Sequence, residues 1–137
     1  ISARIRDELW IKLWGNVAFN PISALTGATL KQICENEETR SLSKNIMIEA
    51  KFIGEKLGVK FPVSIDKRIA GAAGVGDHKT SMLQDLELGR SMEIDAIVSS
   101  VQELGKIVNI STPHIDCVLA LVKQRAYLAG CFDYFNQ

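Results

Sequence analysis

Long apolar runs are missing from this 137-residue sequence, although 47% of its residues are hydrophobic. No uninterrupted apolar stretch approaches the roughly 18 residues that a membrane-spanning helix needs. An excess of charge of one sign is missing as well, because 16 basic and 16 acidic residues cancel. A neutral chain with few aromatic residues is not expected to bind nucleic acid or an anionic membrane. Length and composition favour one globular domain, residues 1–137, with a sizeable hydrophobic core.

Cysteine is also scarce. Cys34, Cys117 and Cys131 are an odd number, are widely spaced and form no C-x-x-C pair. This usage argues against a disulfide framework or a zinc site and favours a reducing, cytoplasmic compartment. We expect all three thiols to be free and buried. His78 and His114 have no further ligand at metal-binding spacing, so no metal site is expected.

Alternating strand patterns are absent, and the apolar residues repeat with helical spacing, which predicts an all-α fold. In the first helix, Ile5, Leu9, Leu13 and Val17 are expected to form the buried line. The expected helices cover residues 4–20, 29–37, 42–57, 80–88, 91–108 and 113–129.

Proline and glycine are expected to interrupt the helical pattern. Pro21 has no N–H to donate, so we expect the first helix to end or kink there, with Gly27 as a stop. The small residues 71–76 are expected to form a loop. Their G-x-x-G-x-G pattern reverses the dinucleotide fingerprint and follows no strand, so it does not predict nucleotide binding.

Local capping signals mark the beginnings of two helices. Thr29 and Gln32 have the form of a capping box. Thr112 is expected to be the N-cap of the last helix, with Pro113 at its first position. The aromatic residues of the segment 131–137 are expected to dock on the body of the domain.

A polar stripe runs through the most apolar part of the first helix. Lys12, Asn16 and Asn20 are spaced four apart, which places them on one face over roughly 12 Å. By spacing alone, a solvated face explains the stripe as well as a ligand site does. Because tryptophans and Phe19 cover most of the circumference, we expect the stripe in a poorly hydrated place that needs a partner. Gly15 costs about 1 kcal/mol relative to alanine and indicates that another group approaches closely.

A second polar cluster lies in residues 80–95, with the sequence TSMLQDLELGRSMEID. A solvated connection between helices explains this segment equally well when it is considered by itself. Its polar members are Ser81, Gln84, Asp85, Arg90, Glu93 and Asp95.

Taken together, the two patterns resemble a known family. The motifs are, in chain order, K-L-x-x-N-x-x-x-N-P, S-M-L-Q-D-x-x-x-G-R-x-x-E-I-D and T-P-H. With these motifs the sequence is similar to the C-terminal domain of the ketopantoate reductases (2-dehydropantoate 2-reductases) over essentially the whole chain. The resemblance implies a helical domain of the class also seen in 6-phosphogluconate dehydrogenase. It further implies an N-terminal Rossmann domain that binds NADPH, with the catalytic cleft between the two domains. Because Ile1 is not a methionine, we expect that this partner domain lies upstream.

The resemblance also assigns roles to residues. The family's catalytic lysine falls on Lys12, and its active-site glutamate falls on Glu93, which is expected to contribute to cofactor binding as well. The family's substrate-binding residues fall on Asn16, Asn20 and Ser81.

Three further positions of the second motif also have counterparts in the family. Asp85 and Asp95 match recurrent acidic positions, for which we expect a structural role. Met92 stands where the family more often has threonine, a departure that affects packing beside the active-site glutamate.

These residue types suit the chemistry that the family implies, the reduction of ketopantoate to pantoate with NADPH in pantothenate and coenzyme A biosynthesis. Hydride transfer to a 2-keto carbon leaves charge on the oxygen, which an ammonium can stabilise or protonate. The implied partners are the 2-keto acid, the Rossmann domain and a second copy in a homodimer, and the isolated domain is expected to be inactive. Two alternatives remain open: a related reductase of another 2-keto acid, and a non-catalytic helical module for dimerisation or partner binding.

Overall fold

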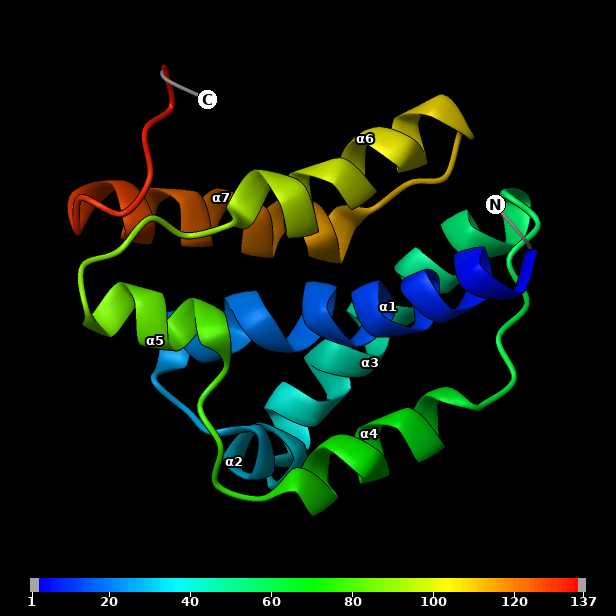
Figure 1. Cartoon of the computed structure of the whole chain (residues 1–137), viewed down its shortest axis with the longest axis horizontal. Helices are drawn as coiled ribbons and strands as arrows, with labels where there is room; N and C mark the ends of the chain where they lie inside the picture. The colour runs from blue at the N-terminus through cyan, green and yellow to red at the C-terminus, as the bar shows by residue number, and fades with distance from the viewer. Residues whose placement is uncertain (1–2, 136–137) are drawn as a thin grey trace.

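The computed structural model describes residues 3–135, and every regular element in that range is helical, so the predicted all-α fold is confirmed. No helix described there is both long and apolar enough to cross a membrane. The elements, drawn in Figure 1, are α1 (Ala3–Thr26), α2 (Leu30–Glu35), α3 (Glu37–Lys56), α4 (Ile65–Val75), α5 (Ser81–Glu87), the π-helix η1 (Asp95–Ser99), α6 (Ser100–Ile107) and α7 (Pro113–Leu128).

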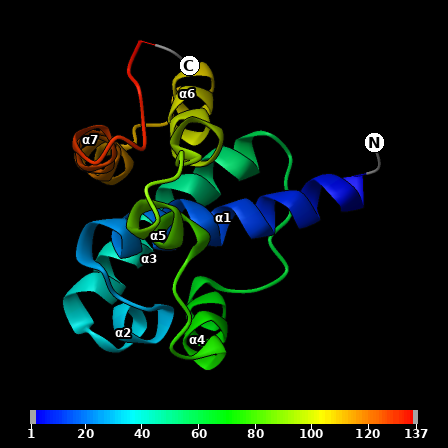
Figure 2. The same ribbon diagram turned by 60° about the vertical axis from the view of Figure 1, so that its left-hand side comes forward.

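Helix α1 runs through the middle of the domain. In Figures 1 and 2, α6 and α7 lie on one side of it and α2 and α4 on the other, while α3 contacts elements of both groups. The side chain of Trp14 is fully buried, and its indole N–H donates to the backbone carbonyl of Met47 in α3 at 2.7 Å. The predicted buried line is wrong at its start, because Ile5 and Leu9 are half or more exposed. The tryptophan face provides the packing surface instead.

Helix α1 does not end at Pro21, as one of our two expectations had it, but continues to Thr26. An interior proline costs roughly 3 kcal/mol through a lost hydrogen bond and a clash. Ile22 and Ala24 are both nearly fully buried after the proline, and their packing offsets that cost. Gly27, with φ of 76°, follows the last helical residue, which confirms it as the stop.

The expected loop at residues 71–76 is wrong, because helix α4 continues to Val75. Ser64 caps α4 by accepting from the backbone N–H of Lys67 at 3.1 Å. Ile69 and Ala72 are buried, and their packing outweighs the low helix propensity of the two interior glycines. Only Gly76, with φ of 92°, ends the helix.

The capping signal predicted for α2 is confirmed, and α3 and α5 begin at caps that were not predicted. Both reciprocal bonds of the capping box between Thr29 and Gln32 are present at the start of α2. Thr80 caps α5, and Gly89 follows its end with φ of 70°. Helix α3 begins earlier than expected, because the side chain of Asn36 accepts from two backbone N–H groups.

The segment after α5 is the least regular. The helix expected from residue 91 begins only around Ile94, opens as the π-helix η1 and continues as α6. Asp95 accepts a hydrogen bond from Ser99 Oγ at 2.7 Å within this π-helical turn.

The start of α7 differs from the prediction in its cap. Pro113 occupies the first turn as expected, but Thr112 makes no capping hydrogen bond and donates to Asp116 instead. The buried carboxylate of Glu49 in α3 takes that role, accepting from the backbone N–H groups of His114 and Ile115 at 2.9 and 3.0 Å. It also lies 2.6 Å from His114 Nδ1.

After α7 the chain docks only in part. Phe132 packs against the core and makes an edge contact with Tyr134, whereas Phe135 is 93% exposed, so docking is wrong for that residue. Residues 136 and 137 lie outside the described range.

The three thiols are free, as predicted, but they are not all buried. Cys34 and Cys131 are buried, whereas Cys117 is exposed. Helix α7 turns Ile115 and Val118 toward the core, which leaves the position of Cys117 on the outer face.

Candidate functional site

Residues of α1, α2, α4 and the start of α5 line a cleft of about 340 Å³. The polar stripe of α1 forms part of its lining, and Ser81 at the start of α5 forms another part. The residues that line the cleft are Lys12, Asn16, Phe19, Asn20, Leu30, Arg68, Ala72, Val75, Thr80 and Ser81. Four of the five predicted site residues therefore meet in one cavity.

The stripe changes from exposed to buried along α1. Lys12 is exposed, Asn16 is half-buried and Asn20 is only 5% exposed. The expectation of a poorly hydrated place is therefore right for Asn20 and wrong for Lys12, which has no ion-pair or hydrogen-bond partner within residues 3–135. An ammonium at the open end and an amide at the closed end can engage different parts of one small molecule.

A short hydrogen-bonded chain connects the closed end of the stripe to α5. The hydroxyl of Ser23 donates to the backbone carbonyl of Asn20 at 2.9 Å and forms a short hydrogen bond with the hydroxyl of Thr80. Thr80 in turn accepts from the backbone N–H of Leu83, which fixes the first turn of α5. These contacts connect α1 to the start of α5, so that Asn20 and Ser81 line the same cleft, and the link through Ser23 had no signal in the sequence.

Arg68 is the charged residue of the cleft lining that the sequence did not single out. Its half-buried side chain crosses from α4 to α1 and lies against Gly15, where an added methyl group would lie 2.6 Å from Cζ and closer still to Nη2. This contact confirms that another group closely approaches Gly15. Burial lowers the pKa of the Arg68 guanidinium, which nevertheless stays protonated at neutral pH.

Glu93 does not line this cleft. It is exposed and belongs to a separate cavity of about 760 Å³ between the segment 91–96 and the residues that follow α7. It forms no ion pair or hydrogen bond with Lys12 or any other residue of the described range. In the same segment Asp85 pairs with Arg90 at 3.2 Å, which agrees with the structural role expected of that aspartate.

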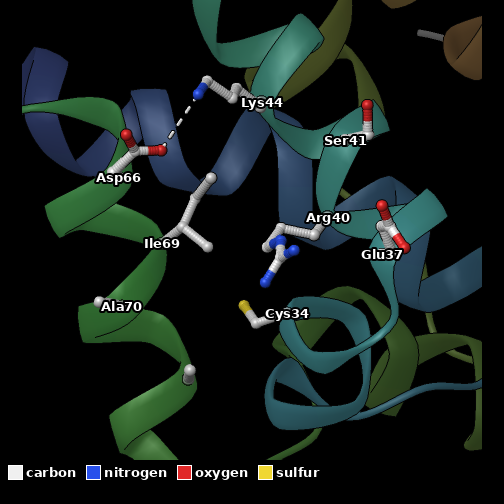
Figure 3. A pocket seen from close by; sticks show the side chains of 9 residues that line it. Cys34, Glu37, Arg40, Ser41, Lys44, Asp66, Ile69 and Ala70 are labelled. Atoms are coloured by element: carbon white, nitrogen blue, oxygen red, sulfur yellow. Dashed lines mark hydrogen bonds and ion pairs between the residues drawn. The ribbon is translucent and has the colours of Figure 1, made fainter.

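A third cavity, of about 510 Å³, lies between α2, α3 and α4 (Figure 3). Lys44 and Asp66 form an ion pair of 3.2 Å at its edge, and Cys34 and Arg40 also line it. Burial raises the pKa of the Cys34 thiol, an effect that neighbouring arginines offset only in part. The thiol is therefore protonated at neutral pH and is a packing group rather than a nucleophile.

The chemistry of the cleft follows from its lining. Lys12 and Arg68 supply two cations, and no carboxylate is among the described lining residues. Two amides and two hydroxyls can both donate and accept hydrogen bonds. Apolar side chains of Phe19, Leu30 and Val75 complete the walls, as in most small-molecule sites. The arrangement fits a small anion that carries several oxygen atoms.

Comparison with known proteins agrees with this chemistry. The family model "Ketopantoate reductase PanE/ApbA C terminal" matches residues 4–126. A 2-dehydropantoate 2-reductase of Mesorhizobium japonicum is 62% identical over 129 residues, which are 94% of this chain and 40% of that protein. The chain therefore spans well under half the length of that curated relative.

Solved structures show the same similarity. The 2-dehydropantoate 2-reductase of Methylococcus capsulatus superposes with a TM-score of 0.82 at 30% identity, over 95% of this chain and 45% of that one. D-mandelate dehydrogenase, solved with NADH and anilino(oxo)acetate, has a TM-score of 0.83 at 20% identity, over 93% of this chain and 55% of that one. The second similarity shows a shared fold only.

Proposed function

Since this chain belongs to the ketopantoate reductase C-terminal family, we propose that it is the substrate-binding and catalytic domain of an NADPH-dependent 2-dehydropantoate 2-reductase. The complete enzyme reduces ketopantoate to pantoate, a step of pantothenate and coenzyme A biosynthesis in the cytoplasm. The observation that carries the proposal is that one cleft unites Lys12 with Asn16, Asn20 and Ser81. NADPH is bound mainly by a Rossmann domain outside these 137 residues, so the chain alone does not turn over.

Lys12 has the central chemical role in this proposal. The nicotinamide cofactor, when bound, supplies a hydride to the carbonyl carbon, and negative charge develops on the carbonyl oxygen. The ammonium of Lys12, unpaired within the described residues, stabilises that charge and donates the proton. Its position at the open end of the cleft suits a group that meets a cofactor arriving from another domain.

The amides and the hydroxyl position the substrate. Asn20 is buried and Asn16 is half-buried, so both can bind substrate oxygens with little competition from water. Ser81 lines the same cleft from the start of α5, whose first turn is fixed by the hydrogen bonds of Thr80. A site that satisfies several substrate oxygens rejects analogues that lack one of them, because a buried polar group is then left unpaired.

Glu93 acts from outside this cleft. Because it is exposed, lines a different cavity and has no partner in residues 3–135, its carboxylate is free to contact the cofactor. Glu93→Gln is then expected to raise the KM for NADPH more than the KM for ketopantoate.

Two alternatives share parts of this argument. A related reductase of another 2-keto acid would use the same cleft, because the named groups recognise a carboxylate and hydroxyls without fixing the carbon skeleton. A non-catalytic dimerisation module would need none of them, so that alanine at Asn16, Asn20 or Ser81 would leave its function intact.

The test is NADPH oxidation by the full-length protein with ketopantoate as substrate. Lys12→Ala is expected to lower kcat at least a hundredfold with little change in the KM for NADPH. Lys106→Ala, which removes an exposed lysine outside the cleft, serves as the control. A near-normal kcat of Lys12→Ala would show that the lysine has no catalytic role. Turnover of a different 2-keto acid alone would favour the related reductase, and NADPH oxidation by residues 1–137 alone would contradict the need for a second domain.

A further inference from the structure

The guanidinium of Arg68 has no protein anion to bind. It has no ion-pair or hydrogen-bond partner within residues 3–135, although five other lysine or arginine side chains in that range pair with carboxylates at 4.0 Å or less. Its half-buried side chain nevertheless lines the cleft, with the guanidinium against Gly15. A desolvated cation without a partner costs free energy, which a bound anion recovers.

Arg68 lies close to the polar stripe of α1, so it can bind the same small molecule as Lys12 and Asn16. Gly15 follows Lys12 by three residues and precedes Asn16 by one, so the guanidinium reaches α1 beside both of them. In a 2-keto acid the carboxylate carbon is bonded directly to the keto carbon. A group that binds the carboxylate therefore also orients the carbonyl.

We propose that Arg68 binds the carboxylate of the 2-keto acid and that this contact selects 2-keto acids over uncharged ketones. The proposal rests on the function proposed above and adds a residue and a role to it. The planar guanidinium offers two parallel N–H groups to the two carboxylate oxygens. Arg68 holds the acid group on the α4 wall while Lys12 and the amides of α1 face the keto oxygen and the hydroxyl. Because Gly15 has no side chain, the guanidinium can lie close enough to α1 for one small molecule to touch both walls.

The experiment compares Arg68→Gln and Arg68→Lys with wild type in the full-length protein. Lys67→Gln removes a neighbouring charge from the exposed side of α4 and is the matched control. The measurements are KM for ketopantoate and for NADPH, and competitive inhibition by trimethylpyruvate and by its uncharged methyl ester. Urea midpoints report whether each variant is folded.

The expected result for Arg68→Gln is at least a tenfold rise in the KM for ketopantoate and in the inhibition constant of trimethylpyruvate. The inhibition constant of the ester and the KM for NADPH should stay within about twofold. Arg68→Lys keeps the charge but not the two parallel N–H groups, so a several-fold rise is expected, and this variant decides the matter if Arg68→Gln does not fold.

Two results would overturn the role of Arg68 while leaving the proposed function intact. One is a KM for ketopantoate within twofold of wild type in both variants. The other is an equal loss of acid and ester binding, which a merely structural arginine would give. If the wild-type protein reduces a different 2-keto acid, the substrate assignment fails. The role of Arg68 is then tested by measuring the KM of the same variants for that acid. If it reduces none, both proposals are overturned.

Discussion

The guanidinium of Arg68 lies against Gly15, so the side chain from α4 reaches α1 at a position that has no side chain of its own. This contact explains why a glycine stands in the middle of a 24-residue helix that is otherwise well packed. A side chain at that position would separate Arg68 from the polar stripe. The glycine therefore belongs to the architecture of the cleft.

Gly15→Ala is the first prediction. By helix propensity alone, alanine would stabilise α1 by about 1 kcal/mol. The new methyl group would also overlap the guanidinium and displace it from the cleft. Because the guanidinium is the end of a flexible side chain, it can move at little cost, so we expect up to about 1 kcal/mol of added stability. We also expect a rise in the KM for ketopantoate comparable to that of Arg68→Gln, measured by initial rates in the full-length protein.

Gly71→Ala is the matched control for that substitution. Gly71 lies in the interior of α4, and a methyl group there would meet nothing within 4 Å. We expect up to about 1 kcal/mol of added stability and an unchanged KM. If Gly15→Ala left the KM for ketopantoate as unchanged as Gly71→Ala does, the close approach of Arg68 would have no consequence for substrate binding.

The second prediction concerns the hydrogen bonds that hold Ser81. Thr80→Val keeps the shape of the side chain but removes the hydroxyl that caps α5 and bonds to Ser23. We expect a loss of about 1–2 kcal/mol in the free energy of unfolding and several-fold weaker ketopantoate binding. Thr80→Ser retains the hydroxyl and should restore both values. If Thr80→Val left the KM for ketopantoate unchanged, or if Thr80→Ser did not restore it, the cap would not be what positions Ser81.

Local signals carried most of what the sequence could predict. The capping box at Thr29, the spacing of the polar stripe and the start of α5 near Thr80 each depend on residues close together in the chain. The cleft itself was predicted only in part, because Arg68 lies 48 residues beyond Asn20, the last residue of the stripe, and matches no motif. Gly15 was its one sequence signal, and that signal indicates an approach without naming the group.

The errors arose where tertiary packing outweighed a local preference. Residues 71–76 favour a loop by propensity, but burial of Ile69 and Ala72 keeps α4 helical. Thr112 has the right residue type for an N-cap, yet a carboxylate from α3, distant in sequence, already occupies that site. Neither outcome can be deduced from neighbouring residues, because each depends on which helix packs against which.

The third prediction tests that long-range cap. The buried carboxylate of Glu49 accepts from two backbone N–H groups at the start of α7 and contacts the ring of His114. Glu49→Ala leaves these donors without a partner, and we expect a loss of about 2–3 kcal/mol in the free energy of unfolding, measured in urea. Glu55→Ala, on an exposed position of the same helix, should change stability by less than about 0.5 kcal/mol. Equal effects of the two substitutions would show that Glu49 does not hold α7.

The last prediction concerns Cys34 and pH. Burial raises the pKa of this thiol in the folded protein above its unfolded value of about 8.5. Below about pH 8 both states keep the proton, and the contribution of Cys34 to stability is complete. As the pH rises further, the unfolded chain loses a proton that the folded protein still holds, so the free energy of unfolding falls.

Cys34→Ala should therefore make the fall in stability between pH 8 and pH 9.5 less steep, as measured by urea unfolding at several pH values. The exposed Cys117 is the control, because Cys117→Ala should leave the slope unchanged. In the wild-type protein at pH 8, iodoacetamide should modify Cys117 well before Cys34, which mass spectrometry of the digested protein resolves. Rapid alkylation of Cys34 in the folded protein, together with a slope that Cys34→Ala does not change, would mean that the thiol is open to solvent and that the third cavity holds a reactive cysteine.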